Sequence, residues 1–296
     1  MTATWAFEAI GTRFEIDAPR ALSLSSREAI VELSERFDRE WSRFRADSVV
    51  RGIARGGRAP APPDAVAMLD ALARAADVAR GAMSPLIGDS LEALGYDPAY
   101  SLRAGDPAPA PAWRGTLTWH DGELALARPG VIDVGALGKG RLVDRITELV
   151  GADLRGEPVI VDGSGDMRIV GGPVRVALEH PFNPQRAIGV WEVTDASIAA
   201  SAVNRRAWPG HGEGEVFHHV LDGRTGLPVR DVVATWAVAP TAMTADLVAT
   251  ALFFDGGDDL ASEHGAEWVR VLSSGVVEAS ASCTAELFRA AAGVSA

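Results

Sequence analysis

The chain has 296 residues, of which 47% are hydrophobic and 23% charged, and its formal net charge is -12. A chain of this length can bury one large core, or two modest cores that share an interface. The acidic balance disfavours nucleic-acid binding, which depends on Lys and Arg neutralising phosphates. An anionic ligand would therefore need a metal ion, or a local cluster of backbone N–H groups and basic side chains.

Three features indicate the compartment. The single cysteine, Cys283, excludes an intramolecular disulfide. Charged residues interrupt residues 1–19, where a signal peptide would have a basic start followed by an apolar run. The apolar run at residues 247–254 is too short to span a membrane. We therefore expect a cytoplasmic protein without direct membrane insertion.

The amino-terminal segment predicts two strands and a helix. Apolar residues alternate on either side of Gly11 over residues 5–16, which predicts a strand, a bend or bulge, and a second strand. Ser25 and Glu28 form a capping-box pattern, and apolar residues then recur at helical spacing up to Phe44. A helix is therefore predicted to start near Ser25.

The next segments predict a second helix and then short strands. Residues 64–81 are rich in Ala and Leu at helical spacing, whereas Pro and Ala dominate the predicted loop at residues 95–113. Residues 131–134 form an apolar run that predicts a buried strand, and it leads directly into a glycine-rich corner. A helix is predicted after that corner, because apolar residues recur at helical spacing over residues 142–150.

The second half of the chain predicts antiparallel strands joined by tight turns. The predicted strands are residues 159–161, 167–170, 174–178, 188–193, 217–221, 232–238, 268–272 and 276–279. Further helices are predicted from Thr244 and over residues 282–292. This irregular alternation with many hairpins favours an α+β fold of mixed, largely antiparallel sheets with flanking helices. We expect residues 1–296 to form a single domain, with two closely packed subdomains as the alternative.

The pattern Asp133-x-x-Ala136-x-x-Lys139-Gly140 stands at the predicted change from strand to helix. Exposed N–H groups at a helix start attract phosphate, and glycines let a ligand approach the backbone closely. The spacing matches neither the Walker A nor the dinucleotide pattern. An ordinary strand–turn–helix corner would carry similar glycines, so both interpretations stay open.

Asp246 and Thr250 are four residues apart in a predicted helix, so their oxygens lie on one face. Mg²⁺ takes few protein oxygens and completes its shell with water and substrate phosphates, so this pair could bind it. In the alternative interpretation, Thr244 is the N-cap, Asp246 interacts with the helix dipole and Thr250 lies at the edge of the core.

His218 and His219 stand on a strand that runs into the predicted turn at residues 222–226. Adjacent residues of a strand point to opposite faces, so only one of these histidines can enter a site. The alternative is a surface histidine beside a turn, because titratable residues are functional only where a site perturbs them.

Taken together and in order, these segments resemble the ApbE family, the FAD:protein FMN transferases, from about residue 10 to residue 256. The segments that carry the resemblance are Ile10-Gly11-Thr12, Trp41-Ser42-Arg43-Phe44 with Ser48, residues 133–140 with Asp144, residues 161–167, residues 219–226 and residues 244–250. The resemblance implies an ApbE-like fold. It also implies Mg²⁺-dependent transfer of FMN from FAD, the substrate, to a Thr or Ser hydroxyl of an acceptor flavoprotein subunit or domain, with release of AMP.

The family's functional residues can be transferred position by position. The implied Mg²⁺ ligands are Asp246, Thr250 and the carbonyl of Ala136. The implied FAD contacts are Ile10, Ala82, Met83, Ser84, Asp133 and Lys139. Lys139 would neutralise charge on the pyrophosphate or orient the ligand, and His219 matches the family histidine implicated in transfer. His219 would act as a base or as a positioning group.

Three departures from the family pattern affect mainly the flavin side. Met83-Ser84-Pro85-Leu86 replaces Phe-Asp-Pro-Thr, Ala200-Ser201-Ala202 replaces Thr-Ser-Gly, and Gly223 replaces a proline of the turn. Two alternative functions therefore remain: a metal-dependent FAD pyrophosphatase, and a non-catalytic FAD-binding protein.

Overall fold

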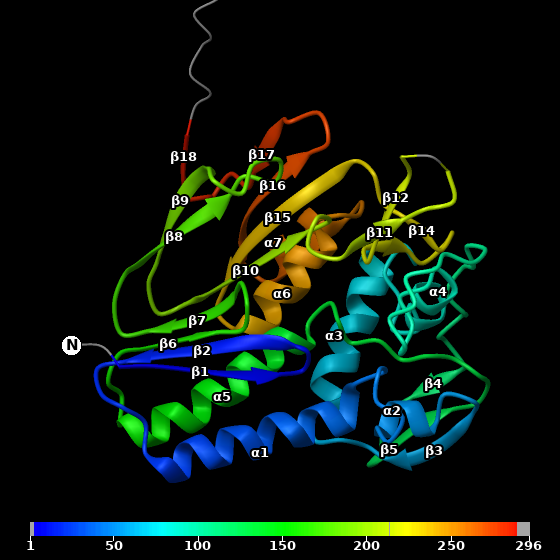
Figure 1. The fold of residues 1–296 in the computed structure, drawn as a ribbon, viewed down its shortest axis with the longest axis horizontal. Helices are drawn as coiled ribbons and strands as arrows, with labels where there is room; N and C mark the ends of the chain where they lie inside the picture. The colour runs from blue at the N-terminus through cyan, green and yellow to red at the C-terminus, as the bar shows by residue number, and fades with distance from the viewer. Residues whose placement is uncertain (1–2, 213, 289–296) are drawn as a thin grey trace, which may run out of the picture.

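An eight-stranded sheet forms the centre of the computed structural model, which describes residues 3–212 and 214–288 (Figure 1). Every neighbouring pair of its strands is antiparallel. In spatial order the strands are β1 (Ala3–Ala9), β2 (Thr12–Ala18), β6 (Val159–Asp162), β7 (Asp166–Val170), β10 (Ser197–Ala202), β15 (Val232–Ala239), β16 (Glu267–Leu272) and β17 (Val277–Ala279).

Smaller sheets lie around this one. Two have three strands, β18 (Glu286–Leu287), β9 (Ala187–Val193) and β8 (Val174–Glu179) in one, and β3 (Gly57–Pro60), β5 (Glu123–Leu126) and β4 (Leu117–Thr118) in the other. Two further pairs are β11 (Ala207–Pro209) with β12 (Val216–His218), and β13 (Leu221–Asp222) with β14 (Leu227–Pro228). The predicted α+β class with largely antiparallel sheets is confirmed.

The helices pack against the large sheet and against one another (Figure 1). They are α1 (Leu24–Trp41), α2 (Val49–Gly52), α3 (Ala65–Val78), α4 (Gly88–Ala93), α5 (Gly138–Leu154), α6 (Ala242–Ala251) and α7 (Gly257–Glu263). Helix α5 contacts α1, α6 and β7, and α6 contacts β10 and β15. Because α5 touches β7 of the large sheet as well as α1 and α6, it lies where the sheet and two helices meet.

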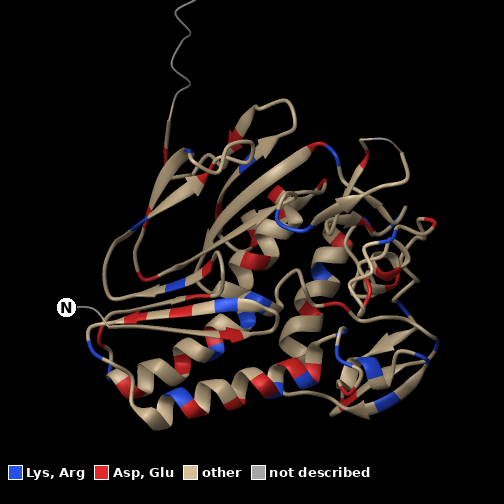
Figure 2. Cartoon of the chain, viewed as in Figure 1, with Lys and Arg blue, Asp and Glu red and all other residues tan. Residues whose placement is uncertain are grey.

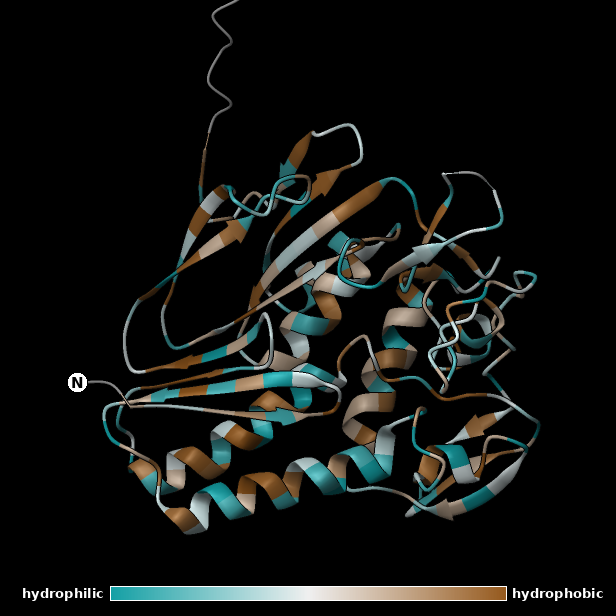
Figure 3. Ribbon diagram, in the orientation of Figure 1, coloured by the Kyte–Doolittle hydropathy of each residue, from teal (hydrophilic) through white to brown (hydrophobic). Residues whose placement is uncertain are grey.

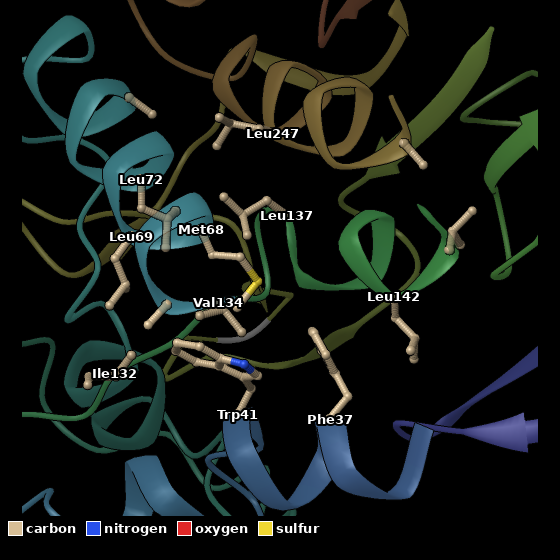
Figure 4. Close-up of a cluster of buried hydrophobic side chains, with 14 of the residues drawn as sticks. Phe37, Trp41, Met68, Leu69, Leu72, Ile132, Val134, Leu137, Leu142 and Leu247 are labelled. Atoms are coloured by element: carbon tan, nitrogen blue, oxygen red, sulfur yellow. The ribbon is translucent and has the colours of Figure 1, made fainter. Parts of the chain in front are cut away.

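Apolar side chains from α1, α3, α5, α6 and the segment before α5 meet in one core (Figure 4). Helix α1 alternates hydrophilic and hydrophobic residues along its length (Figure 3), and its buried Ile30, Leu33, Phe37 and Trp41 recur at helical spacing. Acidic and basic residues are interspersed on the rest of α1 (Figure 2). Burial of this apolar stripe therefore fixes α1 against the core.

The bend predicted at Gly11 is a two-residue hairpin turn. Ala9 pairs with Thr12, so only Ile10 and Gly11 lie in the loop, with φ values of 45° and 73°. Positive φ at both positions is the geometry that matches the twist of two antiparallel strands. The turn directs Ile10 to the edge of the cavity described below.

Three helix and strand predictions are corrected by the structure. Helix α1 begins at Leu24, close to the predicted start, but its cap is Ser23 rather than the Ser25 of the predicted capping box, because the Ser23 side chain accepts a hydrogen bond from the Ser26 N–H. The strand predicted at residues 131–134 is wrong, since these residues pair with no strand of any sheet. Their apolar side chains are buried in irregular backbone instead, and a short apolar run cannot distinguish the two.

The helix predicted at residues 282–292 is also wrong over its described part. Glu286 and Leu287 form β18, which pairs with β9. The Trp191 indole N–H also donates to the Thr284 hydroxyl over 3.0 Å. These tertiary contacts override the local helical preference. Residues 289–292 lie outside the described residues.

No helix within residues 3–212 and 214–288 combines the length and the apolar composition that crossing a membrane would require.

Candidate active site

A cavity of about 830 Å³ lies among α1, β10, β15, the first turn of α5, and α6. Its volume falls within the range of about 300–1,000 Å³ that is common for small-molecule sites. The structure brings to its lining every site residue that the sequence predicts, namely Ile10, Ala82, Met83, Ser84, Asp133, Ala136, Lys139, His219, Asp246 and Thr250. We call Ala136, Lys139, Asp246 and Thr250 the helix wall. We call residues 82–84 and 219–221 of the lining, together with the adjoining Asp222 and Gly223, the turn wall.

Helices α5 and α6 cap each other across the helix wall. Asp246 of α6 accepts a hydrogen bond from the Gly140 N–H in the first turn of α5, over 3.0 Å. In return, the two carboxylate oxygens of Asp144 in α5 accept from the Ala242 and Met243 N–H groups, over 2.8 and 2.9 Å. Unpaired N–H groups at helix starts attract carboxylates, so each helix orients the other.

This close approach requires glycine at position 140. A Cβ there would lie 2.2 Å from the Ala242 carbonyl oxygen, closer than any real contact. The glycine of the predicted Lys139-Gly140 pair is thus explained by helix packing. The alternative interpretation of Asp246 is wrong in part, because Thr241 and not Thr244 caps α6. Asp246 is only 4% exposed and contacts the neighbouring helix.

A second buried acid, Asp166 at the start of β7, lies beside Lys139 and Asp246. The Lys139 ammonium forms an ion pair with Asp166. Within the described residues the fully buried Asp166 carboxylate has no other donor. Burial, and then the charge of Asp246, raise the pKa of Asp166 well above its usual range. Two buried acids thus lie together with one ammonium, and a further cation would favour the charged form of both.

The helix wall offers oxygen donors of the kind that a hard cation prefers. They are the Ala136 carbonyl, the Asp246 carboxylate and the Thr250 hydroxyl. Among the described residues there is no cluster of three or more His, Cys, Asp or Glu side chains arranged to hold a metal. A site with few side-chain ligands suits Mg²⁺, which keeps water and phosphate oxygens in its shell.

The turn wall is joined mainly through backbone atoms. The Gly223 N–H donates to the Ala82 carbonyl over 2.7 Å, and the Leu86 N–H donates to the Ser84 hydroxyl over 3.2 Å. Ala82 and Met83 are buried. Two of the departures from the family pattern, at Met83-Ser84 and at Gly223, thus lie side by side. A proline at position 223 would have no N–H for the Ala82 carbonyl.

As predicted, only one of the two adjacent histidines enters the cavity, but the strand predicted over residues 217–221 is interrupted, because β12 ends at His218 and His219 belongs to no strand. His219 lines the cavity, whereas the Nε2 of His218 lies 2.8 Å from the Val229 carbonyl. The His219 residue is half-buried, but its Nδ1 is shielded from solvent and has no hydrogen-bond partner within the described residues. Burial, with a smaller effect of the Arg206 guanidinium, lowers the pKa of His219 to about 4. The imidazole is therefore neutral at pH 7.

Two residues of this site were not predicted from the sequence. Asp166 lies within the matched segment 161–167, and Arg43 within the matched Trp41–Phe44 motif, but no local pattern assigns either a role. Their partners are distant in sequence, since Arg43 pairs with Asp133 and Asp166 with Lys139. Only the membership of each in a matched motif could have drawn attention to them.

The sequence matches the profile of the ApbE family over residues 10–271. Curated relatives include an FAD:protein FMN transferase of Rhodobacter capsulatus, 25% identical over 95% of this chain and 57% of that protein. Another protein of the same name, from Treponema pallidum, is 28% identical over 80% of this chain and 73% of that protein. The chain thus spans little more than half of the Rhodobacter relative.

Solved structures with the same fold include an ApbE protein of Thermotoga maritima. It superposes with a TM-score of 0.83 and 23% identity over 95% of this chain and 97% of that one. The flavin transferase ApbE of Vibrio cholerae gives a TM-score of 0.77 with 21% identity over 95% and 98% of the two chains. At these identities the superpositions show a shared fold.

Proposed function

Because this chain belongs to the ApbE family, we propose that it transfers FMN from FAD to a Thr or Ser hydroxyl of an acceptor protein, with release of AMP. The names of its curated relatives support the transferase activity. The observation that carries the proposal is the helix wall, where Lys139 and the buried Asp246 line a cavity of about 830 Å³ and Lys139 also pairs with a second buried acid, Asp166. These acids suit a bound cation, and the Lys139 ammonium suits an anionic ligand.

Lys139, in the first turn of α5, binds the pyrophosphate of FAD in this proposal. An ammonium is suited to phosphate oxygens, whereas the Gly138 and Gly140 N–H groups of this turn already donate to Val134 and Asp246. Lys139 keeps its position through its ion pair with Asp166. The Ala136 carbonyl, Asp246 and Thr250 would hold Mg²⁺. When bound, the ion supplies charge neutralisation at the pyrophosphate, which is a main source of catalysis in phosphoryl transfer.

The turn wall binds the flavin, and its His219 accepts the proton of the acceptor hydroxyl. Met83 packs against the isoalloxazine ring, because a thioether contacts an aromatic face favourably. The acceptor hydroxyl oxygen bonds to the phosphorus on the FMN side, and the bond from that phosphorus to the bridging oxygen breaks. AMP leaves with the bridging oxygen. The hydroxyl proton passes to the neutral imidazole of His219, which lines the cavity.

The test is to incubate the purified protein with FAD, Mg²⁺ and candidate acceptors encoded nearby, then measure products and in-gel flavin fluorescence. We expect AMP together with a fluorescent acceptor band, and no band for an acceptor whose hydroxyl has been replaced. AMP with free FMN alone would instead identify a pyrophosphatase. Bound but intact FAD with every acceptor would identify a binding protein, and either result would overturn the transferase proposal.

A further inference from the structure

Arg43 is a buried arginine that follows α1 and is directed at the segment before α5. Its side chain is 2% exposed. Its Nε donates to Asp133 over 2.6 Å and its Nη1 donates to the Tyr96 carbonyl over 2.8 Å. The guanidinium also stacks over the Phe44 ring, 4.1 Å from the ring centroid. A planar, always charged group held on three sides is a rigid anchor for whatever it binds.

Asp133 connects the fixed Arg43 side chain to the turn at Gly135. One carboxylate oxygen accepts from Arg43, and the other accepts from the Gly135 N–H over 2.7 Å. A Cβ at Gly135 would lie 2.9 Å from that second oxygen, so the contact is close. The Asp133 N–H is held as well, because it donates to the Pro85 carbonyl over 3.0 Å. The backbone immediately before Ala136 is therefore fixed on both sides.

We propose that Arg43 is a positioning residue for the metal site: it holds Asp133, which shapes the Gly135 turn so that the Ala136 carbonyl faces Asp246 and Thr250. The inference rests on the proposed function, because it takes these three oxygens as the metal ligands. It assigns Asp133 a structural task alongside the FAD contact expected from the resemblance. Outer groups that orient ligands typically change metal affinity by about 10-fold to 100-fold when removed.

A purely structural role would have different consequences. Arg43 also lies 3.7 Å from Glu92, so it could simply complete a buried charge cluster. In that case its loss would lower thermal stability and leave metal affinity unchanged. Arg51 provides a matched control, because it pairs with the same Glu92 over 2.8 Å but is absent from the cavity lining.

The experiment uses the full chain with Mn²⁺ as the probe and saturating ADP, with the Mn²⁺ dissociation constant measured by electron paramagnetic resonance. We expect Arg43→Lys and Asp133→Asn each to weaken Mn²⁺ binding by about 10-fold or more. The double variant should be scarcely weaker than either single one, because both act through one chain of contacts. Arg51→Gln should bind Mn²⁺ like the wild type while melting at a lower temperature.

The outcomes separate the two proposals. If the wild type binds Mn²⁺ and both variants bind it equally well, Arg43 has no positioning role and the proposed function stands. If the wild type with ADP binds no Mn²⁺, the metal site itself is wrong, and both proposals fail there. If Arg43→Lys does not fold, Asp133→Asn carries the test alone, since it keeps the shape of the side chain.

Discussion

The helix wall and the turn wall of the cavity are held together in different ways. At the helix wall, side chains reach between elements: Asp246 binds the Gly140 N–H and Asp144 binds the start of α6. At the turn wall, the main tie is between backbone atoms, from the Gly223 N–H to the Ala82 carbonyl. Side-chain contacts demand particular residues, whereas backbone contacts tolerate many.

This difference matches where the chain departs from the family pattern. The helix wall keeps the acid, the threonine, the lysine and the glycine that the pattern requires. The turn wall has Met83 and Ser84 in place of an aromatic residue and an acid, and Gly223 in place of a proline. Substitutions should therefore affect the helix wall severely and the turn wall mildly, and the predictions below test that order.

The largest effect is expected for Asp246→Asn. Asparagine can still accept the Gly140 hydrogen bond, but it removes the charge that binds a cation, so the transfer rate should fall on the order of 100-fold or more. The melting temperature should change little, and Thr250→Val should show a milder loss. Asp144→Asn is the control, because it weakens only the cap of α6 and should cost about 1 kcal/mol of stability. Full Mg²⁺-dependent AMP release by Asp246→Asn would remove the metal site.

Protonation of His219 should lower the free energy of unfolding in acid. Its pKa of about 4 lies below the ordinary value of 6.5, so the unfolded chain binds the proton more readily between these values. Stability contributed by the neutral imidazole is therefore complete above pH 6.5 and is lost as the pH falls, by roughly 2 kcal/mol at pH 5.

Thermal unfolding between pH 7 and pH 5 measures this effect. The wild type should lose stability more steeply than His219→Gln, which cannot titrate. His264→Gln removes an exposed histidine at the end of α7 and should follow the wild type. Parallel curves for the wild type and His219→Gln would mean that the imidazole is not held neutral in the cavity.

Gly140→Ala tests the packing of the helix wall. The added Cβ would clash with the Ala242 carbonyl, so we expect a loss of about 1–3 kcal/mol in the free energy of unfolding, together with lower activity. Gly151→Ala, in the same helix, has no atom within 4 Å of the new Cβ. That change should stabilise the protein by up to about 1 kcal/mol. Equal effects of the two changes, measured by urea unfolding, would contradict the close approach of α5 and α6.

Local patterns in the sequence predicted most of the secondary structure, because hairpins and amphipathic helices are determined over short distances. The hairpin of β6 and β7 and the helix after the glycine-rich corner follow from such patterns. Residues 131–134 were mistaken for a strand, since burial alone produces the same apolar run. The strand β18 was missed because it forms only by pairing with β9.

The site was predicted as a set of residues but not as a set of contacts. The resemblance placed Asp246 and Lys139 in one site, yet the pairing of Lys139 with Asp166 depends on the fold. The same holds for Arg43, which is 90 positions from Asp133 in the sequence. Ion pairs between such distant residues leave no periodic signal, and a single sequence cannot reveal them.

The smallest effect is expected at the turn wall, for Gly223→Pro. Proline removes the N–H that binds the Ala82 carbonyl, and a hydrogen bond of this kind contributes about 1 kcal/mol. Gly223→Ala is the matched control, because it keeps the N–H while placing a Cβ 3.1 Å from the Ala82 carbonyl oxygen. In both variants the added side-chain atoms lie close to the Ala82 carbonyl. Only the proline variant loses the hydrogen bond from residue 223 to Ala82, the residue that precedes Met83. In a fluorescence titration, FAD should bind the proline variant about 5-fold more weakly than the alanine variant, which is the equivalent of that energy. If the proline variant bound FAD as tightly as the alanine variant, the backbone tie would not organise the flavin side, and the contrast between the two walls would need another cause.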